Sequence, residues 1–159
     1  MNNQFYVNNR EVIKNLALNT GTSSSPVFTN ICTTSEVTLN SEFEEKTFYV
    51  FCDGVQRAIL TGVALGLDTT VKIDMNNTAI QSVFGNLKTL LSTGSIAQFN
   101  NQLIQFDLLT GISEGVLEYT TFKVPATLKI SDLGGAAEDE GEFGLEITFN
   151  GKGSIVTQG

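Results

Sequence analysis

The 159-residue sequence contains no histidine and no tryptophan, and it has only two cysteines and two prolines. Without histidine, Ser-His-Asp and Cys-His catalytic arrangements and histidine-based metal sites are excluded. No glycine-rich turn opens the one helical segment, so the pattern of a phosphate-binding loop is missing as well. The acidic run Glu138–Glu142 lacks the ligand spacing of a calcium loop and is interpreted as a solvated loop. These absences predict a protein that is not an enzyme and that uses no metal or cofactor.

Basic side chains are scarce. Nine Lys and Arg face 17 Asp and Glu, which gives a net charge of −8. Residues 131–159 alone hold six acidic side chains and one basic side chain. A chain of this charge repels phosphate backbones, which argues against tight binding of nucleic acid.

Long apolar runs are also missing. The most apolar stretch, Ala58–Leu67, is too short to span a membrane, and the first ten residues lack the apolar core of a secretory signal. We therefore expect synthesis in a cytosol and no membrane partner. Cys32 and Cys52 lie in apolar, strand-like segments and are interpreted as buried, reduced thiols. The alternative, a structural disulfide in a secreted protein, has no support without a signal sequence.

What the sequence does contain is strand patterns. The length suits one domain. Residues 1–30 are rich in asparagine and include a Gly-Thr-Ser-Ser-Ser-Pro run, so we predict an N-terminal arm that lies on a neighbour or stays mobile until one arrives. Residues 31–159 are predicted to form a single β-rich domain. Apolar and polar residues alternate with a period of two in 36–43, 70–75, 103–109, 124–130 and 142–149.

Two dipeptides predict hairpin turns. Asp53-Gly54 lies between apolar runs and favours a two-residue type I′ turn, and Asn150-Gly151 predicts a second turn before a short return strand at 153–157.

The arm before Asp53 is apolar on both faces. If Phe48, Val50 and Cys52 face the core, Tyr49 and Phe51 need another partner, because a large exposed apolar patch usually marks an interface.

One helix is predicted, over Thr78–Ser92. Its apolar residues recur at helical spacing and form a single stripe: Ile80, Val83, Phe84, Leu87, Leu90 and Leu91. Thr78 with Gln81 fits a capping box, and Gly94 fits the position after the last turn. The expected fold is mainly β, a sandwich or barrel flanked by this helix.

The order of these features resembles the tail tube (major tail) proteins of siphophages that infect Gram-positive bacteria. The resemblance covers residue 28 to the C-terminus and rests on four segments: FTNICTTSEVTLN, EFEEKTFYV, LTGVALGLDTTVKIDM before the helix, and EFGLEITFNGKGSIVT at the end. It implies subunits that form a ring, six to a ring, with a continuous inner β-barrel. Stacked rings then make a virion tail that is assembled in the host cytoplasm.

The same resemblance implies the partners. They are further copies of the chain, a tape measure protein, a tail terminator and distal tail or baseplate proteins, while DNA passes through the lumen without specific binding. On this basis Tyr49, Phe51, Asp53 and Gly54 are candidates for ring-to-ring contacts. A conduit for DNA needs a wall that does not hold phosphate, so the acidic strand faces are candidates for the lumen. The candidate lumen residues are Glu36, Glu42, Glu142 and Glu146.

Three alternatives remain. The first is the tube of a contractile tail, a bacteriocin or a type VI-like injection apparatus. The second is a monomeric carbohydrate-binding β-sandwich, although such modules usually present exposed Trp or Tyr platforms and this chain has three tyrosines and no tryptophan. The third is an enzyme on an unfamiliar β scaffold, which the missing histidines disfavour.

Overall fold

The computed structural model describes residues 6–22, 24–31, 33–50, 52, 54–100 and 102–156. In these residues one α-helix, α1, and two 3₁₀ turns, η1 and η2, accompany eight strands. The elements are η1 (Asn9–Glu11), β1 (Ile13–Asn19), β2 (Phe28–Asn30), β3 (Thr34–Tyr49), β4 (Gln56–Lys72), α1 (Thr78–Thr93), η2 (Ala97–Phe99), β5 (Gln102–Ser113), β6 (Val116–Ser131), β7 (Glu142–Phe149) and β8 (Ser154–Ile155). The prediction of a mainly β fold with one α-helix is confirmed.

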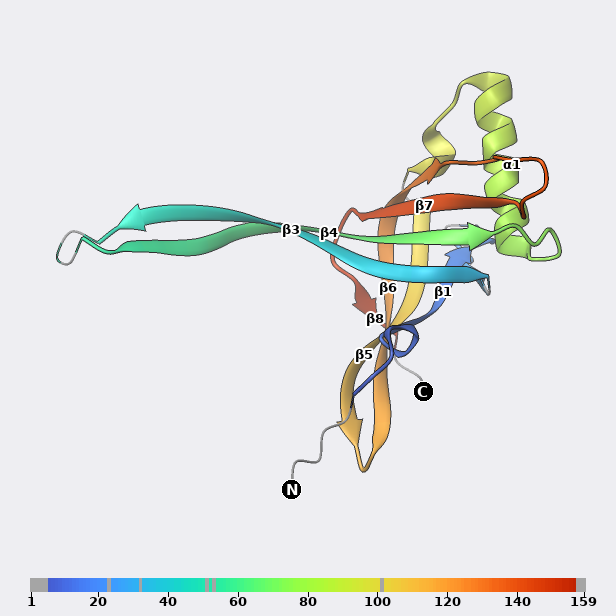
Figure 1. The fold of residues 1–159 in the computed structure, drawn as a ribbon. Coiled ribbons are helices and arrows are strands. Elements are labelled where there is room, and N and C mark those ends of the chain that lie inside the picture. The colour runs from blue at the N-terminus through green and yellow to red at the C-terminus, as the bar shows by residue number, and fades with distance from the viewer. Residues whose placement is uncertain are drawn as a thin grey trace.

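The strands form one antiparallel sheet in the order β2-β1-β5-β6-β7-β4-β3, and β8 pairs with β6. The long strand β6 belongs to both halves of this sheet. Residues 116–126 pair with β5, and residues 126–131 pair with β7. The sheet folds over at β6, so that β5 and the first part of β6 run across the direction of β7, β4 and β3 (Figure 1).

The core lies between the two halves of the folded sheet. Alternation places every second side chain of β4, β6 and β7 inside, as the period of two requires. The largest fully buried side chains are Phe143, Leu67, Ile80, Ile104, Leu145, Ile147 and Val71. All but Ile80 come from strands, so the sheet supplies most of the core and the helix closes one side.

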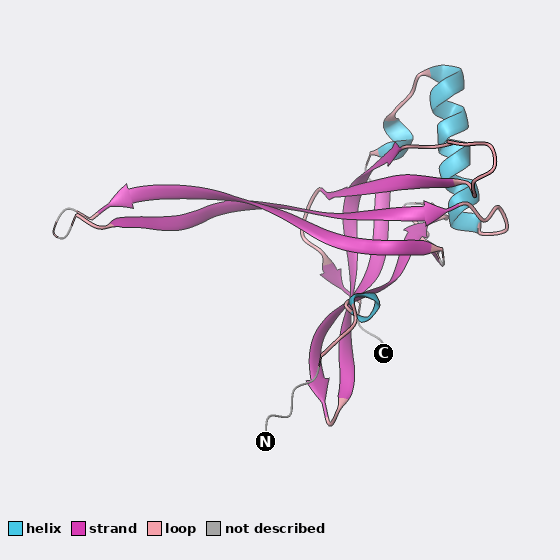
Figure 2. Ribbon diagram, viewed as in Figure 1, coloured by secondary structure: helices cyan, strands magenta, loops and turns pink. Residues whose placement is uncertain are grey.

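The helix α1, cyan in Figure 2, ends one residue later than predicted. Only the first part of its apolar stripe is buried. Ile80 and Val83 are in the core, and Phe84 and Leu87 pack against it, with the Phe84 ring edge-on to Phe143 at 6.3 Å. Leu91 is 87% exposed. The apolar stripe is therefore longer than the part of the helix that packs on the sheet.

The helix ends are fixed by local side chains. The Asn77 side chain accepts a hydrogen bond of 2.8 Å from the Ala79 amide, so Asn77 is the N-cap. The predicted capping box at Thr78 is therefore wrong by one residue, and Gln81 donates to the Met75 carbonyl instead. At the other end Gly94 takes φ +74 and its amide donates to Leu90, which confirms the predicted glycine stop.

The N-terminal segment enters the sheet. Strand β1 pairs with β2 on one side and β5 on the other, and Leu16, Ala17 and Leu18 are buried. The prediction of an arm through residue 30 is wrong for Ile13–Asn19, because this strand is integral to the core of the same chain. The asparagines around this strand make the segment polar on average, so its composition did not predict three consecutive buried side chains.

The hairpin of β3 and β4 is the longest projection of the fold (Figure 1). It is held by the pairs Phe48↔Arg57 and Tyr49↔Gln56, and the Val50 amide donates to Val55. A two-residue Asp53-Gly54 turn would make Cys52 the strand partner of Val55. Because Val50 holds that place instead, this turn prediction is wrong. Gly54 has φ +66, as a reversal with a left-handed residue requires. Phe51 and Asp53 lie outside the described residues.

This projection also corrects two side-chain predictions. Phe48, Val50 and Cys52 do not face the core, because the outer hairpin extends away from it; Phe48 is 40% exposed and Cys52 is an exposed free thiol. Cys32 lies outside the described residues.

A second turn prediction fails for a different reason. Asn150-Gly151 does not reverse the chain: β7 pairs with β6 at Phe149↔Ala126, and β8 continues along the same edge at Ile155↔Phe122. The reversal with φ positive at both central residues is at Glu114 (φ +51) and Gly115 (φ +79), between β5 and β6. These angles and the two-residue loop are those of a type I′ turn.

Candidate assembly surfaces

The outward face of the half-sheet β3-β4-β7-β6 is polar, and the strand register places its residues in rows. One row crosses all four strands: Thr38 pairs with Asp68, Asp68 with Glu146, and Glu146 with Lys129. Directly paired residues point to the same side of a sheet. Because Leu67, Leu145 and Leu128 beside this row are buried, the row itself faces outward.

All four predicted lumen residues lie on this outward face. Glu36 and Glu42 precede and follow Thr38 along β3 by even spacings, and Glu142 shares the face with Glu146 on β7. The side chains of all four are exposed. The structure therefore gathers glutamates from strands that lie a hundred residues apart in the sequence.

The same face has few cations. Between the rows Glu44↔Gly62 and Lys72↔Glu142 it carries six carboxylates, against the two ammonium groups of Lys72 and Lys129. The carboxylates are Glu36, Glu42, Glu44, Asp68, Glu142 and Glu146. Lys72 is itself paired with Glu140 at 2.7 Å, which raises the pKa of Lys72 and lowers that of Glu140. The face is net acidic and repels polyanions at short range.

Glycine keeps part of this face free of side chains. A Cβ on Gly66 would overlap the carbonyl oxygen of Ile147, and a Cβ on Gly144 would lie 2.5 Å from Ser131 Oγ. Both glycines have a negative φ, which other residues could adopt. Glycine is needed at these positions because the neighbouring strand lies too close for a side chain.

The outer hairpin is an apolar projection without a partner in the described chain. Strand β4 pairs with β7 only from Gly66 onward, so residues 41–49 and 56–65 contact mainly one another. Tyr49 is 70% exposed, and other apolar side chains along the same hairpin are exposed as well: Phe43 57%, Ile59 51% and Leu60 62%. Of the predicted ring-to-ring residues, the structure describes Tyr49 and Gly54, and both are exposed at the outer end of the hairpin.

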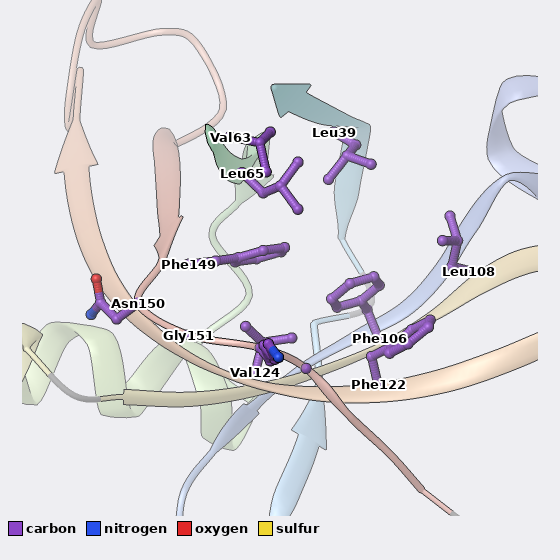
Figure 3. A pocket seen from close by; sticks show the side chains of 12 residues that line it. Leu39, Val63, Leu65, Phe106, Leu108, Phe122, Val124, Phe149, Asn150 and Gly151 are labelled. Carbon is purple, nitrogen blue, oxygen red and sulfur yellow. The ribbon is translucent and has the colours of Figure 1, made fainter. Parts of the chain in front are cut away.

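An apolar cleft of about 540 Å³ opens where the hairpin leaves the folded sheet (Figure 3). Leu39, Val63 and Leu65 form one wall, and Phe106 and Phe122 belong to the opposite wall. Phe106 stacks on Phe149 at 5.8 Å and lies 5.9 Å from Phe122. The cleft is thus the open end of the core, and no local sequence pattern predicts it because its walls come from five strands.

The N-terminal turn is fastened by a small polar cluster. The Tyr119 hydroxyl donates to the Glu11 carbonyl at 2.6 Å, and Lys14 lies 3.3 Å from the Glu11 carboxylate and 4.6 Å from the centre of the Tyr119 ring. Lys14 lowers the pKa of Glu11. The cluster is half-buried and joins η1 to β6, which gives it a structural role.

Comparison with known proteins yields the fold. No protein-family model and no curated protein matches this sequence. Among solved structures, a chain of the "tail of empty GTA particle", determined by helical refinement with C6 symmetry, superposes with a TM-score of 0.62 at 10% identity. The match covers 96% of this chain and 100% of that chain. This chain has the fold of a phage-like tail protein.

A second match points the same way. A chain of the virion of the native gene transfer agent (GTA) particle has a TM-score of 0.55 at 11% identity, covering 90% of this chain and 96% of that one. Both matches span nearly all of both chains, so the projecting hairpin and the folded sheet belong to one shared architecture.

The described residues hold no group of three or more Cys, Asp or Glu placed to bind a metal ion. None of their helices combines the length and apolar character needed to traverse a bilayer. The surfaces with the clearest chemistry are therefore the acidic face, the apolar hairpin and the sheet edges.

Proposed function

We propose that this chain is the structural subunit of a phage tail tube, which assembles into rings that stack into a conduit for DNA. The observation that carries the proposal is the division of surfaces on one half-sheet. Its outward side is a net acidic face, and its strands β3 and β4 continue into an exposed apolar hairpin. A conduit for DNA needs a net acidic wall, and a stack of rings needs an apolar surface for the contact between rings.

The acidic face is assigned to the lumen. Lys or Arg contacts to phosphate would release counterions and favour binding, and stacked rings would multiply that effect. A wall with more carboxylates than ammonium groups avoids this. Glu146 lies near the middle of the face, with Glu42 toward one end and Glu36 and Glu142 toward the other, and all four are assigned to the wall.

The hairpin is assigned to the contact between rings. Docking the hairpin on another copy would bury Tyr49 and other exposed apolar side chains of the hairpin, and exposed apolar surface of this kind usually marks an interface. A hairpin of one copy that docks on the body of another makes a head-to-tail contact, which naturally propagates as an open filament. The C6 symmetry of the matched tail supports six copies in each ring.

The remaining partners follow from the tube. We assign a tape measure protein to the lumen before DNA passes, and a terminator and distal tail proteins to the two ends. The host cytoplasm is the assigned place of assembly. A monomeric carbohydrate-binding role fits less well, since Tyr119 is half-buried and hydrogen-bonded to Glu11, which leaves no Tyr119 platform for a sugar.

Size-exclusion chromatography with negative-stain electron microscopy tests the proposal. The purified chain is examined over a range of concentrations, alone and after addition to tail extracts of the parent particle. Rings or hollow tubes are the expected result. A chain that stays monomeric at every concentration and that does not enter tails would refute it.

A further inference from the structure

Two backbone edges of the acidic half-sheet are unpaired. The outer edge of β3 has no neighbouring strand among the described residues, because β3 ends the strand order. At the other side, β5 pairs with β6 only up to Ala126, so residues 127–131 have no strand partner on their outer edge in the described part of the chain, although η2 also contacts β6. Open edges are templates for pairing with another chain.

These two edges are suited to each other in direction. Three antiparallel steps lead from β3 through β4 and β7 to β6, so β3 and β6 run in opposite directions. A rotation about an axis along the strands preserves strand direction. In a ring, β3 of one copy therefore meets β6 of the next copy as an antiparallel pair, which continues the alternation of the sheet.

The register of this joint follows from barrel geometry. Within one copy, the perpendicular row runs Thr38-Asp68-Glu146-Lys129. A closed barrel needs a stagger, and a shear equal to the strand number gives a strand tilt of about 36°. With four strands from each copy, that stagger is about four residues per copy.

A four-residue offset has two directions, and they differ sharply. One places Lys129 opposite Thr34, where β3 begins, so the end of β6 is left without a partner strand. The other places Lys129 opposite Glu42 and pairs all of 127–131 with 40–44. It also sets Leu128 beside Phe43 on the core side, and Phe43 is 57% exposed in the single chain.

We propose that Lys129 of one copy pairs with Glu42 of the next where β6 and β3 join neighbouring subunits, and that this ion pair, together with the Leu128–Phe43 contact, favours that register. The proposal rests on the ring assembly proposed above. Glu42 and Lys129 are both exposed on the acidic face, and neither takes part in the ion pairs of the described residues. Lys129 is one of two ammonium groups on that face, and the other, that of Lys72, is already paired with Glu140.

Charge reversal tests the ion pair. K129E and E42K are each made alone and together, and the protein concentration at which rings or tubes first appear is measured by light scattering and negative-stain microscopy. Each single reversal is expected to raise that concentration several-fold, since like charges directly opposite destabilise a strand pair. The double variant is expected to return to near the wild-type value.

Glu36 supplies the matched control. It lies on the same strand and face as Glu42 but six residues away along β3, outside the proposed pair. K129E combined with E36K should not restore assembly. Rescue by E36K equal to that by E42K would overturn the proposal, and so would single reversals that assemble as the wild type does.

Cysteine cross-linking reads the register directly. In a C32S/C52S background that forms tubes, S131C is combined with N40C, T38C or E36C. A disulfide needs two Cα atoms within about 7 Å of each other. Residues directly opposite each other on paired strands meet this condition, whereas diagonal neighbours lie at or beyond this distance. Oxidation should join subunits into ladders for S131C with N40C, and far less for the other two pairs.

The outcomes separate the two proposals. If the wild-type chain forms no rings or tubes, the proposed function fails. If tubes form but the S131C/T38C or S131C/E36C pair cross-links best, the function stands and the register proposed for Lys129 and Glu42 is wrong.

Discussion

Truncation of Ile80 is the sharpest test of how α1 is held to the sheet. Ile80 is fully buried, whereas Leu91 on the same apolar stripe is 87% exposed. Ile80→Ala removes three buried methyl or methylene groups from a core that cannot fully collapse around the space. We expect the free energy of unfolding to fall by about 2–5 kcal/mol. Against a typical total of about 5–15 kcal/mol, this loss is large.

Urea unfolding of the unassembled subunit measures the effect. With a denaturant dependence of about 1–3 kcal/mol per molar, a loss of about 3 kcal/mol lowers the unfolding midpoint by about 1–3 M. Leu91→Ala is the matched control, and we expect a change within about 0.5 kcal/mol because its side chain is already in water. Leu87→Ala, at a half-buried position on the same stripe, should fall between the two.

The reasoning is refuted if Ile80→Ala and Leu91→Ala have equal effects, or if Ile80→Ala costs less than about half a kcal/mol. Either result would mean that the stripe is not packed on the sheet. The substitution also changes helix propensity, but that contribution favours alanine by less than about 0.7 kcal/mol and has the opposite sign.

Three further results are expected. Tyr49→Ser with Phe51→Ser should give a folded subunit with unchanged circular dichroism that no longer polymerises. Tubes of normal appearance would show that these residues do not form the contact between rings. Glu36→Lys with Glu146→Lys should still assemble, yet slow DNA ejection in a salt-dependent manner, and ejection at the wild-type rate would count against a lumenal face. Gly66→Ala should lower the urea midpoint, because its Cβ overlaps the Ile147 carbonyl; an unchanged midpoint would show that β4 and β7 separate freely.

The sequence predicted best where the signal was local. The stripe from Ile80 to Leu87 and the stop at Gly94 lie within one helix, and periodicity with a glycine at the end was enough to locate α1. The alternation in β7 likewise identified Phe143, Leu145 and Ile147 as buried. Both patterns depend only on how side chains project from their own element.

Turn chemistry was a weaker guide, because a turn depends on what its flanking strands pair with. Asn150-Gly151 has the composition of a type I′ turn, yet β6 extends past it and offers β8 the same edge that it offers β7. Glu114-Gly115 has a less typical composition and makes the tight turn, since β5 and β6 pair up to Ser113↔Val116. Long-range pairing decided both cases.

The candidate surfaces show the same limit. Alternation could place Glu36 and Glu42 on one face of their strand, and Glu142 and Glu146 on one face of theirs. It could not show that the two faces are the same surface, because that requires β4 to lie between β3 and β7. The open edge at 127–131 was equally hidden, since it exists only because β5 stops pairing at Ala126.

The exposed edges and the hairpin together argue against an isolated subunit as the working form. A long, unpaired strand edge beside apolar side chains is a hazard that monomeric proteins usually cover, charge or break with bulges. Here β3 carries carboxylates on its outward face but keeps Phe43 and Leu39 exposed on the other, at 57% and 41%. Pairing with a second copy resolves both problems at once, because it satisfies the backbone edge and covers the apolar side chains. The charges then disfavour the register two residues back, in which Lys129 would face Asn40 and lose its carboxylate partner. Two residues forward Lys129 would face Glu44, so the S131C/N40C cross-link is the measurement that separates Glu42 from Glu44 as its partner.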